Sequence, residues 1–273
     1  MGMALRRRGL ADTVVGIGRR SVSIQAALEV GAVDEATLDF EEGVAGADLV
    51  VLATPIRAFE PVTTAAAPAM RSGAVITDVA STKVQVIRTV RHALRQRPDV
   101  HYVPAHPMAG SEQRGPRAAQ ADLFEGAVCI VTAPEEPPTP ARQQVTDMWK
   151  ALGANVIRME PEAHDHLVAR ISHLPHLAAA ALMQVIQEGE ARLSGGGLRD
   201  TTRVASGDPR LWVDICRTNR DQIHRALSDY IGLLQDAADA VQSGDLEPLR
   251  RLLEEAKGKR DRTIAEAPDL LPE

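Results

Sequence analysis

Polar residues interrupt the apolar pattern at four places where an element of regular structure should end. Histidine, serine, lysine and aspartate side chains at these places could exchange protons or bind an anion. The first three places follow predicted parallel strands, and ligands bind at the carboxyl ends of such strands. We therefore expect a ligand site built from the segments Ala53-Thr54-Pro55, Asp78 to Lys83, Ala105 to Gly110 and Ile171 to His176.

Four histidines lie close together in the sequence, at His164, His166, His173 and His176. Imidazole is a common zinc ligand, so a metal site is one interpretation of this cluster. The spacing argues against it, because Pro175 disturbs the helical turn between the last two histidines and no H-E-x-x-H pattern occurs. We expect no metal.

The elements that must position these groups fall into two parts. Up to residue 160, short β-branched runs alternate with longer helical stretches, and near-continuous apolar runs are typical of strands covered on both faces. This predicts an α/β domain over residues 1–160, a Rossmann-like doubly wound parallel sheet, followed by an all-α domain over 161–273. The strands are expected at 13–17, 48–53, 74–79, 101–105, 127–132 and 155–159, with helices at 21–31, 57–71, 83–96, 141–153, 162–188, 190–205, 209–242 and 245–260.

Composition limits the partners. The 273 residues are 44% hydrophobic and carry a formal net charge of -6, so a folded core is expected and neither nucleic acid nor an anionic membrane is favoured. No apolar run is long enough for a membrane span. Cys129 and Cys216 lack a C-x-x-C pattern, which fits a cytoplasmic protein.

A dinucleotide-binding sheet begins with a strand, then G-x-G-x-x-G, then a helix. Residues 2–9 resemble the second half of that helix, which leaves two interpretations. Either they form a simple N-terminal helix, or the first strand and the glycine-rich loop are missing from this sequence, which we favour.

The next run favours NADP as cofactor, with NAD possible. After the strand at 13–17, Gly18 is followed by Arg19 and Arg20, where an NAD site would place a carboxylate. Two guanidinium groups suit a 2′-phosphate, although adjacent arginines can also be a solvated turn. We expect these residues, with Thr54, Pro55 and Asp78 at later strand ends, to contact the cofactor.

Taken in order, the motifs make the chain similar to the prephenate and arogenate dehydrogenase family, over nearly its whole length. That family oxidatively decarboxylates a cyclohexadienol to an aromatic product, in tyrosine biosynthesis. The matching motifs are Thr54-Pro55, Asp78-Val79-x-Ser81-x-Lys83, His106-Pro107-Met108-Ala109-Gly110-Ser111-Glu112, His164-Asp165, Ser172-His173-Leu174-Pro175-His176, the run from Gly195 to Arg203, Asp208-Pro209 and Trp212.

The resemblance implies two catalytic groups. His106 would accept the proton of the substrate hydroxyl, and Ser81 would hydrogen-bond the same hydroxyl and orient the histidine. Taken alone, His106 could simply cap backbone groups at a strand end. Ser81 could instead be the N-cap of the helix that begins near Lys83.

The resemblance also implies the substrate-binding groups. Arg203 would clamp the side-chain carboxylate, with Arg199 as the competing candidate and Glu112 as an ion-pair partner that gates the pocket. His173 matches a histidine near the substrate, and Trp212 would form part of the pocket wall.

The resemblance further implies that the helical half forms a homodimer. An apolar stripe of Leu227, Tyr230, Ile231, Leu234, Ala237 and Val241 follows helical spacing, although such stripes usually belong to the core of their own chain. Two other functions stay open: another two-domain NADP-dependent hydroxyacid dehydrogenase, or a truncated, non-catalytic dimeric protein with impaired cofactor binding.

Overall fold

The structure is a computed structural model, and it describes residues 1–110, 115–132, 139–187 and 189–266. The chain forms two compact units, Met1–Arg220 and Asp221–Glu273. The predicted boundary at residue 160 lies where the strands end, whereas the first compact unit continues through four further helices.

The first unit contains an α/β sheet domain, and most strands occupy the residues that the apolar runs predict. β1 pairs with β2, β3 with β4, β4 with β5, and β7 with β8, all in parallel. The Rossmann-like class is therefore confirmed. The strands are β1 (Val15–Ile17), β2 (Glu35–Thr37), β3 (Leu49–Leu52), β4 (Val75–Asp78), β5 (His101–Val103), β6 (Ala105–Pro107), β7 (Val128–Thr132) and β8 (Asn155–Met159).

Two details of the sheet differ from the prediction. β2 was not expected, because its Glu-Ala-Thr sequence contains a single β-branched residue. The run at 101–105 divides at Pro104 into β5 and β6, and β6 pairs antiparallel with β7, which places His106 opposite Ile130. The pairing of β6 with β7 is thus antiparallel, whereas the other strand pairs described are parallel.

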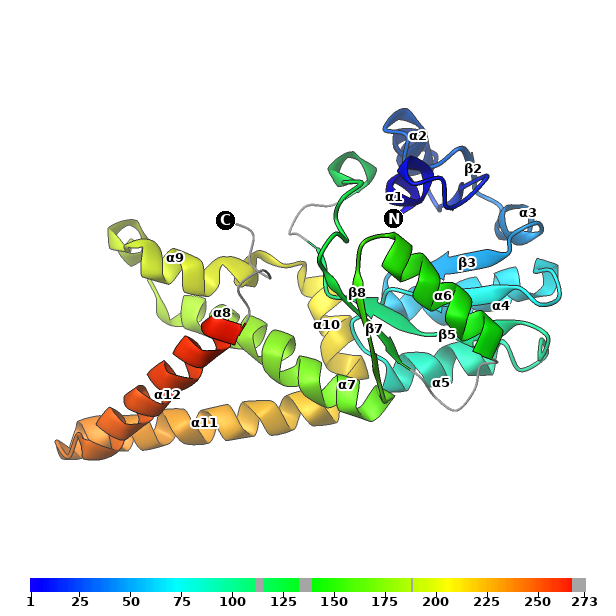
Figure 1. Cartoon of the computed structure of the whole chain (residues 1–273). Coiled ribbons are helices and arrows are strands. Elements are labelled where there is room, and N and C mark those ends of the chain that lie inside the picture. The colour runs from blue at the N-terminus through cyan, green and yellow to red at the C-terminus, as the bar shows by residue number, and fades with distance from the viewer. Residues whose placement is uncertain (111–114, 133–138, 188, 267–273) are drawn as a thin grey trace. The chain divides into compact units, whose positions relative to one another are not determined.

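Helices cover both faces of the sheet, as Figure 1 shows. Ile76 belongs to an apolar cluster that includes Phe59 and Val86, whereas its neighbour Val75 belongs to a second cluster around Trp149. Successive side chains of a strand point to opposite faces, so both faces of β4 are buried. The helices are α1 (Gly2–Arg7), α2 (Ser21–Glu29), α3 (Phe40–Val44), α4 (Phe59–Ala66), α5 (Val84–Ala93) and α6 (Thr139–Ala151).

Past β8 the described part of the chain is helical, as predicted; the helices up to α11 are shorter than expected, whereas the last, predicted at 245–260, extends over Glu247–Glu266. The stretch at 162–188 consists of α7 (Pro161–Val168), a π-helical turn (Ala169–His173) and α8 (Leu174–Val185). α9 (Gly196–Thr202) and a 3-10 turn (Arg203–Ser206) follow.

The single helix predicted at 209–242 is wrong. It divides at Asn219 into α10 (Pro209–Thr218) and α11 (Arg220–Ser243). Asn219 leaves the helical conformation, with φ -124° and ψ 33°, and its buried amide hydrogen-bonds elsewhere.

The described residues of the second compact unit contain the rest of α11 and α12 (Glu247–Glu266). Much of the predicted apolar stripe on α11 is not intrachain core, since Ile231, Leu234 and Val241 are 61%, 51% and 62% exposed. Such a row of exposed apolar residues is a candidate interaction surface.

Candidate active site

A buried ion pair closes the end of β4. Nζ of Lys83 lies 2.5 Å from Oδ1 of Asp78, and both side chains are fully buried. The hydroxyl of Tyr102 donates to Oδ2 of Asp78 at 2.7 Å, and Lys83 also donates to the backbone oxygen of Ala105 at 2.6 Å. Asp78 thereby ties β4 to β5 and to the strand that carries His106.

This pairing corrects the expectation that Asp78 contacts a cofactor. Both of its carboxylate oxygens already accept hydrogen bonds from protein donors, and the side chain has no exposed surface. Asp78 therefore holds the turn together, because an ion pair this deeply buried is stable only while each charge keeps its partner.

The turn after β4 leads into α5, whose N-terminus is capped by a residue of another helix, far away in the sequence. The carboxylate of Asp165, on α7, accepts from the backbone N–H groups of Lys83 at 2.7 Å and Val84 at 2.9 Å. The negative charge at a helix N-terminus is favourable. Ser81 lies in the preceding turn, partly buried, and the N-cap position is Lys83, so the N-cap interpretation of Ser81 is wrong.

A chain of hydrogen bonds runs from this cap to His106. Oδ1 of Asp165 lies 2.8 Å from Nδ1 of His164, and Nε2 of His164 lies 2.9 Å from Nδ1 of His106. The two imidazole rings meet edge to face, with centroids 5.1 Å apart. His106 is 8% exposed and His164 is fully buried.

Burial and charge keep His106 neutral. Desolvation lowers the pKa of His106 well below its ordinary value, and the positive charge of Lys83 lowers it further. A neutral imidazole has one nitrogen that can accept a proton. Cys129, on the neighbouring strand, has its pKa raised by burial to about 12, so its thiol stays protonated.

A second histidine lies on the other side of Asp165. The amide nitrogen of Asn219 donates to the backbone oxygen of Asp165 at 2.8 Å and lies 3.3 Å from Nδ1 of His173. Burial lowers the pKa of His173 to about 4. Among the described residues, Nε2 of His173 has no hydrogen-bond partner although it is buried.

Trp212 connects His173 to the turn that carries Arg203. Its ring stacks on His176 at a centroid distance of 3.5 Å and meets His173 edge to face at 6.0 Å. A Cβ at Gly207 would lie 2.4 Å from Nε1 of Trp212, so only glycine allows this close approach. Trp212 therefore packs within this cluster.

Helix α10 also contacts the turns that follow β3 and β4. Arg57, just after the Thr54-Pro55 turn, makes a 2.9 Å ion pair with Asp214. Thr82, next to Ser81, lies 2.9 Å from Thr218, oxygen to oxygen. These bonds hold α10 against the carboxyl ends of the central strands.

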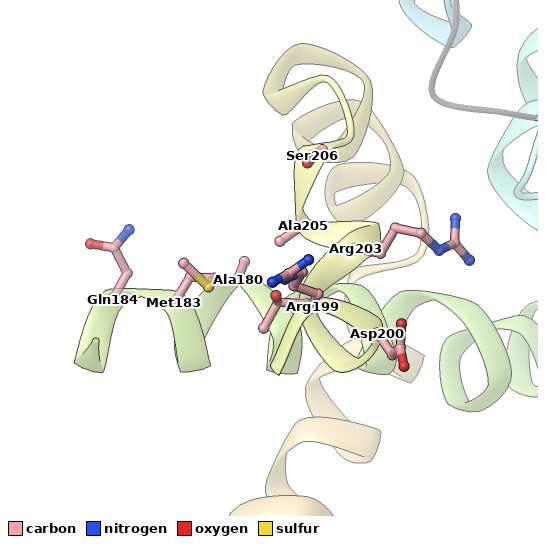
Figure 2. A pocket seen from close by; sticks show the side chains of 9 residues that line it. Ala180, Met183, Gln184, Arg199, Asp200, Arg203, Ala205 and Ser206 are labelled. Carbon is pink, nitrogen blue, oxygen red and sulfur yellow. The ribbon is translucent and has the colours of Figure 1, made fainter. Parts of the chain in front are cut away.

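The two candidate arginines lie beside one pocket of about 560 Å³, formed by α8, α9 and the following turn. Both are exposed. Figure 2 shows the guanidinium of Arg203 extending to the opposite side from Gln184, whereas Arg199 lies nearer the middle of the pocket. The structure thus gathers both candidates in one region.

The candidate cofactor residues lie at the ends of β1 and β3. Gly18 follows β1, and a Cβ there would lie 2.6 Å from Cγ2 of Ile24 on α2. Arg19 and Arg20 are exposed, and within the described part of the chain neither has an ion-pair partner. Thr54 and Pro55 are exposed directly after β3. Two uncommitted cations beside a helix N-terminus fit a phosphate group.

Glu112 lies outside the described residues. Sequence reasoning gave no role to Lys83, Asp165 or Asn219, and it considered His164 only as a metal ligand; together these four residues form the buried framework of the site. Three of them belong to quoted motifs, and that membership was the available signal. Asn219 gave none, because it lies inside a continuous helical pattern.

Across residues 1–110, 115–132, 139–187 and 189–266, no group of three or more His, Cys, Asp or Glu side chains is arranged to hold a metal ion. Instead, His164 and His173 have protein partners. The same residues contain no helix that is long and apolar enough to cross a bilayer.

A Rossmann-like sheet with a buried, neutral histidine at its edge, followed by helices that carry paired arginines, defines a two-domain dehydrogenase. Residues 1–158 match the nucleotide-binding domain of prephenate dehydrogenase, and residues 160–255 match its dimerization domain. The chain belongs to the prephenate dehydrogenase family and is an oxidoreductase.

Individual relatives agree over most of their length. The chain is 37% identical to cyclohexadienyl dehydrogenase from Zymomonas mobilis, over 86% of this chain and 80% of that protein. It is 32% identical to prephenate dehydrogenase from Bacillus subtilis, over 96% and 72%. The crystal structure of prephenate dehydrogenase from A. aeolicus in complex with hydroxyphenyl propionate and NAD+ superimposes with a TM-score of 0.87 at 29% identity, covering 96% of this chain and 93% of that one.

Proposed function

We propose that this protein oxidatively decarboxylates prephenate or arogenate, giving 4-hydroxyphenylpyruvate or tyrosine, in tyrosine biosynthesis. The observation that carries the proposal is His106, a buried imidazole whose Nδ1 is engaged by His164 at 2.9 Å. Its Nε2 has no hydrogen-bond partner among the described residues. A nearly enclosed, neutral imidazole with one uncommitted nitrogen is suited to take a proton from a hydroxyl group.

The chemistry divides between this chain and the cofactor. A bound nicotinamide cofactor would supply the acceptor for the hydride that leaves the ring carbon bearing the hydroxyl. His106 takes the hydroxyl proton as the C–O bond gains double-bond character. Loss of the ring carboxylate as carbon dioxide then leaves its electron pair to the ring, which becomes aromatic, and the proton can return to the phenolic oxygen. Ser81, in the turn after β4, would hydrogen-bond the same hydroxyl.

His173 supports the substrate with a hydrogen-bond donor. The amide nitrogen of Asn219 has no lone pair to offer, so it can only donate to Nδ1 of His173. The proton of neutral His173 is then on Nε2, the buried atom without a partner among the described residues. This N–H group is available to a polar substrate oxygen.

The guanidinium groups of Arg203 and Arg199 are the candidates for the substrate's side-chain carboxylate. A planar guanidinium matches a carboxylate with two parallel hydrogen bonds. We assign the clamp to Arg203, with Arg199 as the alternative, and Trp212 to the adjoining wall. Glu112 would be the ion-pair partner of Arg203.

NADP is the proposed cofactor, with NAD possible. Arg19 and Arg20 are exposed after β1, where a carboxylate would favour an unphosphorylated ribose. Gly18, Thr54 and Pro55 would contact the same molecule. Family membership supports nucleotide binding, and the choice between NAD and NADP rests on these two arginines.

We further propose a homodimer formed through the helical half, with residues 1–160 as the nucleotide-binding domain and 161–273 as the dimerisation domain. The exposed apolar residues of α11 support a partner of the same kind, because a second copy would remove them from water. The two free cysteines fit a cytoplasmic location.

Steady-state kinetics with prephenate and arogenate, each with NAD and NADP, tests the proposal. Release of carbon dioxide together with an aromatic product supports it. A keto acid formed without decarboxylation would identify another hydroxyacid dehydrogenase, and absence of turnover with weak cofactor binding would identify a non-catalytic protein.

A further inference from the structure

The hydrogen bonds around Asp165 allow only one arrangement of the ring protons on His164 and His106. Asp165 accepts from two backbone N–H groups of α5, and its Oδ1 also contacts Nδ1 of His164 at 2.8 Å. A carboxylate accepts hydrogen bonds and has none to donate. The proton of neutral His164 is therefore on Nδ1.

The next bond then has a fixed direction. With its proton on Nδ1, His164 presents a lone pair at Nε2, 2.9 Å from Nδ1 of His106. Nδ1 of His106 must be the donor, so the proton of neutral His106 is on Nδ1 and the lone pair is on Nε2. The opposite direction would place two lone pairs face to face at the carboxylate, or require a charged imidazolium in a fully buried position.

We propose that Asp165 and His164 act in series as positioning residues for His106: the carboxylate orients His164, which fixes the proton of His106 on Nδ1 and reserves Nε2 as its basic nitrogen. The proposal rests on the proposed function, because it assigns the atom that performs the base role. When His106 gains a proton on Nε2, the bond to His164 persists, and the negative charge of Asp165 lies one ring away.

Asp165, the first residue of the hydrogen-bond chain to His106, is held firmly in place. Asp165 is bound at its carboxylate by the first turn of α5 and at its backbone oxygen by Asn219. Its side chain is 3% exposed, so competing water is largely excluded. The orientation of His106 is therefore set by groups that the substrate does not touch.

Nitrogen-15 NMR of histidine-labelled, full-length protein without substrate tests the proposal directly. We expect His106 to carry its proton on Nδ1 in the native chain. In His164→Leu, which removes the acceptor, we expect a mixture of the two neutral forms and a turnover at least about 10-fold lower, with little change in the Michaelis constant. His164→Gln retains an acceptor and should recover part of both.

His166→Leu is the matched control, since His166 is exposed on the same helix, two residues further on. It should alter neither the proton position on His106 nor the turnover. A proton on Nε2 of native His106 overturns the proposal, as does an unchanged proton position in His164→Leu or His164→Gln variants that have lost turnover.

The NMR measurement also decides the question if His164→Leu does not fold, because the native protein and His164→Gln report the same atom. It separates this proposal from the proposed function as well. If His106 of the native chain carries its proton on Nδ1 but the protein fails to oxidise prephenate or arogenate, the proposed function is contradicted, whereas the positioning role of Asp165 and His164 is still supported.

Discussion

Asn219 holds the backbone of Asp165, whose carboxylate caps helix α5: its amide nitrogen donates to the backbone oxygen of Asp165 at 2.8 Å. The same amide reaches His173. Asn219, the residue that ends α10, thus contacts both Asp165, which lies next to His164, and His173.

Replacing His106 by Asn should lower turnover by about 10²- to 10⁴-fold, because general-base assistance is lost. The Michaelis constants should change far less, since asparagine keeps a similar size and polarity. Steady-state kinetics measures both. His92→Asn, on the exposed face of α5, is the control and should behave like the native enzyme. Equal loss in both variants would remove His106 from the base role.

Acid should destabilise the protein through His173. Its pKa is about 4 in the folded chain and about 6.5 in the unfolded chain, so the unfolded state binds more protons between these values. The contribution of neutral His173 to the free energy of unfolding is fully present above pH 6.5. It is lost as the pH falls from about 6.5 to about 4, and the total loss is about 3 kcal/mol. Denaturant unfolding across this range, compared with His173→Gln, measures it. Parallel curves for the two proteins would contradict the assignment.

Replacing Lys83 by Met should cost about 3–5 kcal/mol, because Asp78 is left as a buried, unpaired charge. Combining it with Asp78→Asn should recover part of that loss. Arg71→Ala, which breaks the exposed pair with Asp48, should cost about 1 kcal/mol or less. Chemical unfolding gives all three losses, and similar losses for the two single variants would refute the buried-pair argument.

Replacing Arg203 by Ala should raise the Michaelis constant for the substrate by about 10- to 100-fold, the value of a charge-assisted hydrogen bond. Turnover at saturation should change little, because the clamp binds the ground state and the transition state alike. Arg199→Ala is the comparison. If Arg199→Ala shows the larger effect, the clamp belongs to Arg199.

Replacing Ile231 and Leu234 together by Asp should convert a dimer into a monomer, since two charges would have to be buried at the interface. Light scattering after size-exclusion chromatography, at several concentrations, gives the mass. Leu38→Asp is the control, because Leu38 is equally exposed at 50% but follows β2 in the sheet domain. A dimeric double variant would place the interface elsewhere.

The sheet could largely be predicted from sequence because most of its strands are short apolar runs rich in β-branched residues. The predicted run at 155–159 coincides with β8, whereas β2 was missed because its exposed first residue and its alanine carry no apolar signal. The break at Asn219 was missed for a different reason. The apolar period continues through it, and only the three-dimensional position of Asp165 gives its amide a reason to leave the helix.

The candidate site was predictable as a set of motifs but not as a network. His106 and His164 are 58 positions apart, and nothing local in either segment indicates that their rings touch. Asp78 was misread because a carboxylate at a strand end suggests a ligand, and its buried partner Lys83 became visible only in the structure.

The carboxylate of Asp165 starts helix α5 and also begins the chain of contacts that ends at His106. A molecule in which α7 has not yet docked would therefore lack both, with a frayed helix and an imidazole free to exchange its proton between two nitrogens. The start of α5 and the orientation of His106 are then both coupled to the docking of α7.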